Sequence, residues 1–272
     1  MRIENAAAPT EIKKVLSIAG SDCSGGAGIQ ADSKTCSAHG VYAMSVITCV
    51  VAENTVRVLG AQDISPALIE KQIDAVFEDI PPDAVKIGML PCRDGMLAVS
   101  RRLRVWRPAH VVIDPVMVAK GGCALMAPEA IDTFLAQVVP LADVITPNLP
   151  EAESMTGYAI ATRADMEKAA RRIYDLGCRA VLVKGGHGTG EATDVLFDGR
   201  DCRTFSSPRI NTKNTHGTGC TYASAIACNL ALGFPLFEAV ERAKQYITQA
   251  IAHGLPLGKG CGPTNHFHGK IT

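Results

Sequence analysis

The residues best placed to do chemistry lie in one segment late in the chain, where a thiol follows closely spaced glycines. The segment reads Thr212-Lys-Asn-Thr-His-Gly-Thr-Gly-Cys220 and runs without a break into a helix-like stretch. Glycines at positions 217 and 219 would expose backbone N–H groups at a helix N-terminus, where unpaired donors and the helix dipole favour an anion. A transferring phosphoryl group fits such a site, because its transfer needs positioning, charge stabilisation and a residue that accepts a proton.

Cys220 stands where that proton acceptor would be. A thiol at a helix N-terminus, with His216 and Lys213 close in sequence, is expected to have its thiolate form favoured and to act as a base. The alternative is that Cys220 packs as a small apolar residue, as we expect of the other cysteines. The glycine turn beside it favours the reactive interpretation.

Four more polar residues follow apolar runs that look like buried strands. They are Asp114, Asn148, Glu151 and Lys184. Carboxylate oxygens at strand ends suit a Mg²⁺ ion that bridges nucleotide phosphates, and a lysine there can neutralise phosphate charge. The spacing leaves a second interpretation open, in which Asn148 caps a helix and Glu151 lies in its first turn.

The elements that must position these residues follow from the hydrophobic pattern. Short runs rich in valine and isoleucine alternate with stretches of helical period, which is typical of an α/β protein with a mostly parallel central sheet. Ligands bind at the carboxyl ends of such strands, so the polar loops should converge on one site. The predicted strands cover residues 15–19, 41–51, 56–63, 84–87, 111–113, 144–146, 180–183 and 195–197. The predicted helices cover residues 29–38, 66–77, 94–105, 128–138, 151–155, 164–176, 217–232 and 237–252.

Composition narrows the class of protein. The 272 residues carry 27 Lys and Arg against 27 Asp and Glu, which argues against a nucleic-acid partner. No secretory signal and no membrane-spanning run is present. Ten cysteines without C-x-x-C or zinc spacing indicate free thiols and a cytoplasmic location. No linker divides the chain, so we expect an N-terminal extension over residues 1–14 and a single domain over residues 15–272.

A second glycine-rich segment, Gly20-Ser-Asp-Cys-Ser-Gly-Gly-Ala-Gly28, follows the first predicted strand. Its G-x-G-x-x-A part, with Glu53 ending the next strand, leaves an NAD-dependent Rossmann enzyme as a remote alternative. The turn would let backbone N–H groups approach a ligand, although a purely structural turn is equally compatible. The absence of G-x-x-x-x-G-K-[ST] excludes the P-loop NTPases as a template. His266-Phe-His268 lacks neighbouring acids or cysteines, so we expect a structural or disordered tail there rather than a metal site.

Seven motifs follow one another along the chain: G-S-D-x-S-G-G-A-G-I-Q-A-D, K-I-G-M-L, I-D-P-V-M, T-P-N-L-P-E, V-K-G-G-H, N-T-H-G-T-G-C and G-P-x-x-H-F-H. Together they resemble the hydroxymethylpyrimidine/phosphomethylpyrimidine kinases of thiamine biosynthesis, in the ribokinase-like superfamily. The resemblance covers nearly the whole chain. It implies a three-layer α/β/α fold, a homodimer, and an enzyme that uses ATP and Mg²⁺ to phosphorylate 4-amino-5-hydroxymethyl-2-methylpyrimidine and then its monophosphate.

The resemblance also implies roles for individual residues. Cys220 takes the catalytic position that is Asp in most ribokinase-like enzymes. The anion hole would be formed by Gly217, Thr218 and Gly219. Asp114 and Glu151 would bear on Mg²⁺ and phosphate. The residues facing ATP would be Asn148, Lys184 and Thr212, and those lining the pyrimidine pocket would be Gly20, Asp32, Glu53, Met89 and Val116.

Glu53 departs from the pattern that the resemblance implies, since the usual pyrimidine kinases carry Gln there. A Gln amide offers one donor and one acceptor to the ring nitrogen and exocyclic amine, whereas an ionised Glu only accepts. Our hypothesis is that either the Glu53 carboxyl or the bound pyrimidine is protonated. A different ring substrate is the other explanation.

Two alternative functions remain open at this stage. Pyridoxine/pyridoxal kinases belong to the same superfamily and include members with Cys at the catalytic position, but the A-x-N-T segment and the G-P-x-x-H-F-H tail favour the pyrimidine kinase. A non-catalytic pyrimidine or vitamin sensor would be expected to lose Mg²⁺ or base positions, and none is lost in this sequence.

Overall fold

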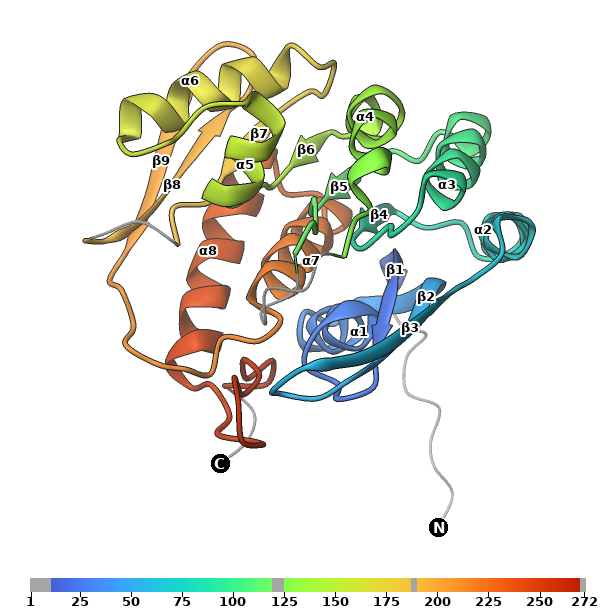
Figure 1. Cartoon of the computed structure of the whole chain (residues 1–272), viewed down its shortest axis with the longest axis horizontal. Coiled ribbons are helices and arrows are strands. Elements are labelled where there is room, and N and C mark those ends of the chain that lie inside the picture. The colour runs from blue at the N-terminus through green and yellow to red at the C-terminus, as the bar shows by residue number, and fades with distance from the viewer. Residues whose placement is uncertain (1–10, 119–124, 187–189, 270–272) are drawn as a thin grey trace.

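One mixed sheet forms the centre of the molecule (Figure 1). A computed structural model describes residues 11–118, 125–186 and 190–269, so His187 and most of the expected N-terminal extension lie outside it. In these residues the strand order is β3-β2-β1-β4-β5-β6-β7-β8-β9. The strands are β1 (Lys14–Asp22), β2 (Tyr42–Glu53), β3 (Val58–Asp63), β4 (Ala84–Ile87), β5 (Val111–Ile113), β6 (Val144–Ile145), β7 (Val181–Val183), β8 (Ala192–Phe197) and β9 (Cys202–Ser207).

The middle of this sheet is parallel and its margins are antiparallel. The pairs from β2 through β1, β4, β5 and β6 to β7 are parallel, whereas β3 pairs antiparallel with β2 and the β7–β8–β9 pairs are antiparallel. Every residue of β4, β5 and β7 is buried, as expected for strands covered on both faces. The mostly parallel sheet that the sequence predicts is therefore confirmed.

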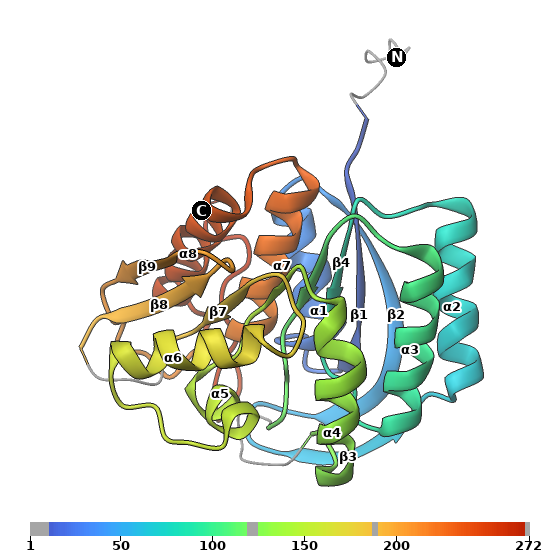
Figure 2. The ribbon, with the colours of Figure 1, turned by 90° about the horizontal axis from the view of Figure 1, so that it is seen from above.

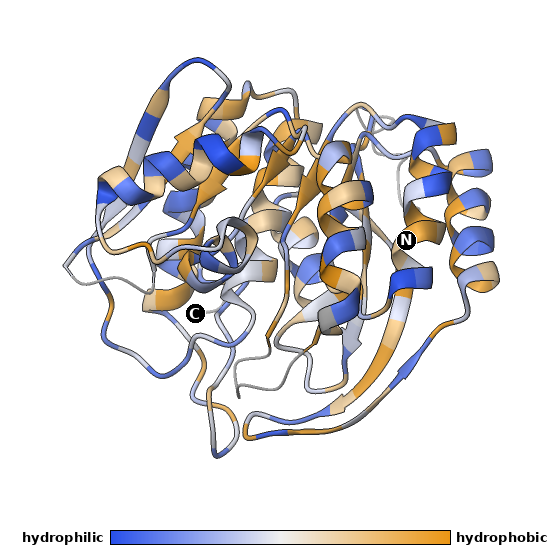
Figure 3. Cartoon of the chain, turned by 45° about the horizontal axis from the view of Figure 1, so that its top comes forward, coloured by the Kyte–Doolittle hydropathy of each residue, from blue (hydrophilic) through white to orange (hydrophobic). Residues whose placement is uncertain are grey.

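Helices cover both faces of the sheet and make the three-layer α/β/α fold (Figure 2). On one face lie α1 (Gly28–Ala38), α7 (Thr218–Ala231) and α8 (Leu236–Ala252). On the other lie α2 (Pro66–Asp79), α3 (Arg93–Trp106), α4 (Ile131–Thr133), α5 (Leu149–Thr156) and α6 (Arg163–Tyr174). Apolar residues follow the strands and the inward helix faces, while the outer faces are hydrophilic (Figure 3). None of the described helices is long and apolar enough to cross a bilayer.

Helix α7 differs from its neighbours because it is buried all round. Each of its residues from Thr221 to Ala231 is buried, as its continuous apolar and small-residue sequence requires. It packs against β1, β4 and β5, so its exposed start lies at the carboxyl edge of those strands. The fold thus places the glycine turn at residues 217–219 where parallel strands present their loops.

Two predictions about elements need correction. Strand β9 was not expected, because Phe205 is its one buried residue and the rest of this edge strand is polar and partly exposed. The helix expected over residues 128–138 is instead a succession of short turns: a 3₁₀ turn at Pro128–Ala130, α4, a π turn at Phe134–Val138 and a 3₁₀ turn at Val139–Leu141. Pro140, which cannot continue an α-helix, lies within the last turn. The single-domain boundary at residue 15 stays a prediction.

Candidate active site

The predicted anion hole lies at the start of α7. Gly217 is the residue before the helix and has a left-handed conformation with φ 76° and ψ 10°. A side chain at Gly217 would overlap the carbonyl oxygen of Gly26, so only glycine lets these two backbone segments meet. No side chain caps the helix N-terminus. Thr218 N donates to Thr215 O at 3.3 Å, whereas no described bond takes the N–H groups of Gly217 and Gly219, which are therefore available to an anion.

A buried ion pair faces this helix start. The Lys184 Nζ lies 2.7 Å from Asp114 Oδ1, and Thr146 Oγ1 donates to the same oxygen at 3.3 Å. The other carboxylate oxygen of Asp114 would be 2.9 Å from a Cβ atom at position 219. Gly219 thus keeps open a space between the helix N-terminus, one carboxylate oxygen and one ammonium group, which is the donor set that a phosphate with a bound divalent cation needs.

Asn148 and Glu151 have the capping role that the sequence left open, while their roles toward ATP and Mg²⁺ stay predictions. They form a capping box at the start of α5, with Asn148 N donating to Glu151 Oε2 at 2.8 Å and Glu151 N donating to Asn148 Oδ1 at 2.9 Å. The Asn148 backbone also bridges to Lys184, which brings the cap to the buried ion pair. Burial raises the pKa of Glu151 to about 7; Lys184 opposes this shift and Asp114 adds to it. A cation bound here would favour the ionised form of Glu151.

Cys220 lies beside the predicted anion hole, but the expectation of a favoured thiolate is wrong. Burial raises the pKa of this half-buried thiol to about 12; Lys86 lowers it, and Asp32 and Asp114 raise it further. The two cations expected from the sequence do not act on it. Lys213 is exposed, and His216 Nε2 is bound to Asp22. The thiol is therefore protonated at neutral pH until the charge around it changes.

Lys86 is a site residue that sequence reasoning missed. It is fully buried (0% exposed) in β4, and its Nζ lies 2.9 Å from Asp32 Oδ2. Asp32 also accepts from Ser17 Oγ at 2.5 Å and from Ser224 Oγ, one helical turn after Cys220, at 2.8 Å. The Asp32 carboxylate is thus used to tie α1, β4 and α7 together beneath Cys220. Its place in the pyrimidine pocket stays a prediction. A lysine inside the apolar run of β4 is the signal that could have revealed the network.

The residues predicted to line the pyrimidine pocket lie at the ends of β1 and β2. A register shift between Ala19 and Ser21 interrupts the pairing of these strands at Gly20. A side chain at Gly20 would come within 3.1 Å of the Met89 sulfur, so these two predicted pocket residues lie together. Glu53 is half-buried at the end of β2. Burial raises its pKa, Asp22 raises it further and His216 lowers it.

The remaining predicted residues lie around this centre. Val116 is half-buried, and its N–H donates to the Asp114 carbonyl at 2.9 Å, which keeps it beside the ion pair. Thr212 accepts from Asn214 N at 3.1 Å in the segment before α7, and no described contact joins it to Asn148 or Lys184.

His266, in the C-terminal segment, is buried. Its Nε2 lies 3.1 Å from Thr221 Oγ1, and burial lowers its pKa to about 4. The expectation of a structural tail is confirmed.

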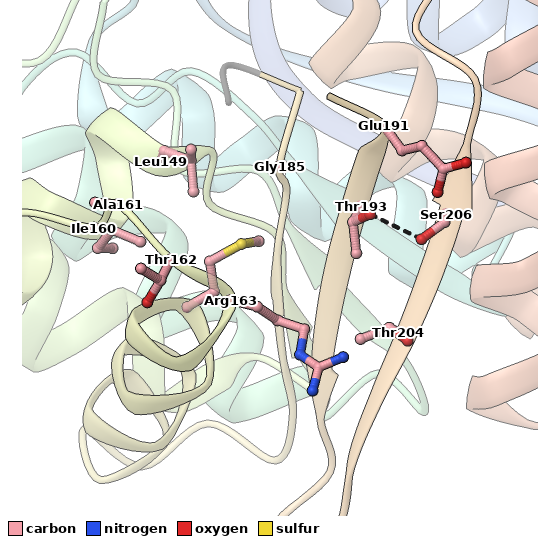
Figure 4. A pocket seen from close by; sticks show the side chains of 11 residues that line it. Leu149, Ile160, Ala161, Thr162, Arg163, Gly185, Glu191, Thr193, Thr204 and Ser206 are labelled. Atoms are coloured by element: carbon pink, nitrogen blue, oxygen red, sulfur yellow. Dashed lines mark hydrogen bonds between the residues drawn. The ribbon is translucent and has the colours of Figure 1, made fainter. Parts of the chain in front are cut away.

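An open groove of about 320 Å³ flanks the site on the α5 and α6 side (Figure 4). Leu149, Arg163 and Gly185 line it together with Thr193 and Ser206, whose hydroxyls are 2.8 Å apart. Gly185 follows Lys184 directly. The groove therefore lies next to the Asp114–Lys184 side of the site, and Glu53 is not among the residues that line it.

A solved structure with the same architecture shows what class of protein this is. The ADP complex of *Bacillus subtilis* pyridoxal kinase superimposes with a TM-score of 0.90 and 40% sequence identity, covering 96% of this chain and all of that one. This likeness agrees with the features described above. The sheet is covered by helices on both faces, and the predicted anion hole lies at the N-terminus of a buried helix. The fold and the site thus define a phosphotransferase of the ribokinase-like class.

Sequence relatives narrow the class further. The family model described as phosphomethylpyrimidine kinase matches residues 22–265. The thiamine biosynthesis bifunctional protein ThiED of *Geobacter sulfurreducens* is 52% identical over 97% of this chain, which spans about half (54%) of that relative. The hydroxymethylpyrimidine/phosphomethylpyrimidine kinase of *Rhizobium meliloti* is 51% identical over 93% of this chain and 96% of its own length. The chain belongs to the phosphomethylpyrimidine kinase family.

Proposed function

We propose that this chain transfers a phosphoryl group from ATP, with Mg²⁺, to 4-amino-5-hydroxymethyl-2-methylpyrimidine and then to its monophosphate. The observation that carries the proposal is the meeting of the α7 N-terminus with the Asp114–Lys184 pair across the space that Gly219 leaves open. A relative named as a hydroxymethylpyrimidine/phosphomethylpyrimidine kinase is 51% identical to the chain over 96% of its own length. The small pyrimidine alcohol would lie between Gly20, Met89 and Glu53.

The chain's own residues can perform the transfer by positioning and charge. The N–H groups at residues 217–219 would bind the transferring phosphoryl group, and Lys184 would neutralise its charge. Asp114 and Glu151 would hold Mg²⁺. Because Asp114 raises the Cys220 pKa and Lys86 lowers it, a cation that offsets Asp114 would favour loss of the thiol proton to solvent, and the resulting thiolate could accept the proton of the attacking hydroxyl.

A comparison of two buried thiols tests this proposal. Cys220→Ala should lower kcat on the pyrimidine alcohol by about 10²-fold or more, because it removes the proton acceptor. The matched control is Cys178→Ala, which removes a thiol with a pKa that burial also raises to about 12, but one that donates to Ile173 O away from the site. The control should keep kcat within about twofold of wild type. Equal activity of Cys220→Ala and Cys178→Ala would remove Cys220 from its role.

Phosphorylation of pyridoxine or pyridoxal is the second candidate function. The structural likeness to a pyridoxal kinase favours it, although the identity of 40% is lower than the 52% and 51% of the pyrimidine kinase relatives. Parallel assays with both alcohols decide between them. Higher kcat/KM on pyridoxine or pyridoxal than on the pyrimidine would overturn our assignment. The homodimer that the resemblance implies and the cytoplasmic location that the cysteine pattern indicates stay predictions.

A further inference from the structure

Asp22 receives an unusual number of hydrogen bonds. It is the last residue of β1, and only 1% of its surface is exposed. Its Oδ1 accepts from Ser24 N at 2.7 Å, and its Oδ2 accepts from Gly26 N at 2.9 Å, Ala27 N at 2.8 Å and His216 Nε2 at 2.9 Å. Burial raises the pKa of this carboxyl, but the hydrogen bonds from His216, Ser24 and Ala27 outweigh burial and hold it well below its usual value. Asp22 is therefore an anion throughout the neutral range.

These bonds join the two glycine-rich segments of the chain. Residues 24–27 form the turn after β1, and His216 directly precedes the anion hole at Gly217. The fit is close at two points: a side chain at Gly26 would strike the His216 ring, and one at Gly217 would strike the Gly26 carbonyl. His216 is also held by its backbone, which donates to Gly262 O at 3.0 Å and accepts from Thr264 N at 3.2 Å.

The Glu53 carboxyl lies close to both Asp22 and His216. The ligand-type atoms of Asp22, Glu53 and His216 are all within 4.8 Å of one another. Oδ2 of Asp22 accepts from three donors, one of which is His216, so Asp22 and His216 are joined by a hydrogen bond and the Glu53 carboxyl lies beside them. The Asp22–His216 pair consequently stands between the expected pyrimidine pocket, at Glu53, and the expected phosphoryl site, at Gly217.

We propose that Asp22 and His216 form a positioning pair that holds the anion hole in register with the pyrimidine pocket. Neither side chain needs to touch a reacting atom: Asp22 fixes the β1 turn and His216 together, and His216 fixes the start of α7. Misplacement by about 1 Å lowers phosphoryl transfer far more than it lowers binding. The inference rests on the proposed function, because the pair acts only if both sites are used in one transfer.

Steady-state kinetics of three variants test the pair. In Asp22→Asn the amide would point a donor at a backbone N–H, and in His216→Ala the donor to Asp22 is lost. We expect each to lower kcat at saturating substrates by about 10- to 100-fold, with KM for ATP changed less than threefold. His216→Gln keeps a donor close to the position of Nε2 and should recover at least part of the loss. The double variant should lose no more than the worse single variant, because both act through one contact.

A control separates positioning from simple loss of stability. Asp143→Asn removes a carboxylate that also accepts from a backbone N–H, Val111 N at 2.7 Å, and from a cation, Arg179 Nη1 at 2.8 Å, but outside the site. It should keep kcat per folded enzyme within about twofold. Values of kcat near wild type in Asp22→Asn and His216→Ala, or additive losses in the double variant, would overturn the inference. If Asp22→Asn does not fold, the two His216 variants decide alone.

The wild-type assay separates this inference from the proposed function. Absence of turnover on the pyrimidine alcohol, with turnover on pyridoxal, would remove the proposed substrate. The variants are then measured with pyridoxal, and the same losses are expected. Normal wild-type turnover of the pyrimidine with undiminished variants would instead remove the positioning pair and leave the proposed function in place.

Discussion

The two edges of the central sheet both pair aspartates with cations, but in very different surroundings. At the amino edge, Asp143 accepts from the backbone of Val111 and pairs with Arg179, whose side chain is 80% exposed. At the carboxyl edge, the Lys184–Asp114 pair is almost wholly buried. Exposed pairs contribute little to stability, and buried pairs carry a desolvation penalty that a hydrophobic pair would avoid. The buried pair thus lies at the edge where we propose that the chemistry takes place, and the exposed pair lies at the opposite edge.

The largest effect on stability is expected from removal of Lys86, whose side chain is fully buried. Lys86→Met leaves the Asp32 carboxylate buried without its ion-pair partner, and it should lower the free energy of unfolding by about 3–5 kcal/mol. Urea unfolding of the variant measures the loss. The variant Lys86→Met/Asp32→Asn removes both charges and should recover much of the stability. A loss below about 1 kcal/mol in the single variant would contradict the assigned burial of this pair.

Lys184→Met should act mainly on the reaction. It removes the cation that faces the expected phosphate site, and we expect kcat/KM for ATP to fall by about 10²- to 10³-fold. Steady-state kinetics at varied ATP check this. Lys244→Met is the matched control, since Lys244 forms a buried pair of the same length, 2.7 Å, with Asp194. If both variants lost the same activity per folded enzyme, Lys184 would have no special part in catalysis.

Glu53→Gln tests whether a titrating carboxyl at the carboxyl edge of the sheet controls the affinity for the pyrimidine. The pKa of Glu53 is raised, so its proton is retained to higher pH than in an exposed Glu and is lost as the pH rises through that value. Affinity for the neutral pyrimidine should then fall with rising pH by up to about tenfold per pH unit, and the amide variant should show no such fall. Calorimetric titration across pH 5 to about 9 measures both profiles. Identical profiles would refute the hypothesis that one proton is shared between Glu53 and the ring.

The smallest effect is expected at the amino edge. Arg179→Met removes an exposed ion pair and should change the free energy of unfolding by less than about 1 kcal/mol, with kcat unchanged. Thermal unfolding and the standard assay measure both quantities. A loss comparable to that of Lys86→Met would show that the two edges are energetically alike.

Local signals in the sequence predicted the residues at the strand ends and the helix start. Asp114, Asn148, Glu151 and Lys184 each follow an apolar run, and parallel strands bring such positions to one edge. Cys220 directly follows a glycine turn and precedes a helix-like run. These signals depend only on residues that are close together in the sequence. For this reason the sequence could predict that Cys220, Asp114, Glu151 and Lys184 meet, as they do in the structure.

The sequence did not reveal contacts between residues that lie far apart in the chain. Lys213 and His216 are near Cys220 in sequence, yet the cation that lowers its pKa is Lys86 from β4. Lys86 in turn meets Asp32 across 54 positions. Strand β9 was missed for a related reason. Its polar residues show no hydrophobic pattern typical of a strand, and they belong to the sheet because they pair with β8.

The contact between Asp22 and His216 also bears on how the chain folds. It joins residues 194 positions apart, and Ser224 and Asp32 meet across 192. Contacts of such long range close late, because the loop entropy must be overcome first. A chain whose β-α units have formed but whose residues 216–224 have not docked on β1 and α1 would be compact and nearly complete in secondary structure, yet unable to transfer a phosphoryl group. Recovery of activity during refolding should therefore lag behind recovery of the helical circular dichroism signal.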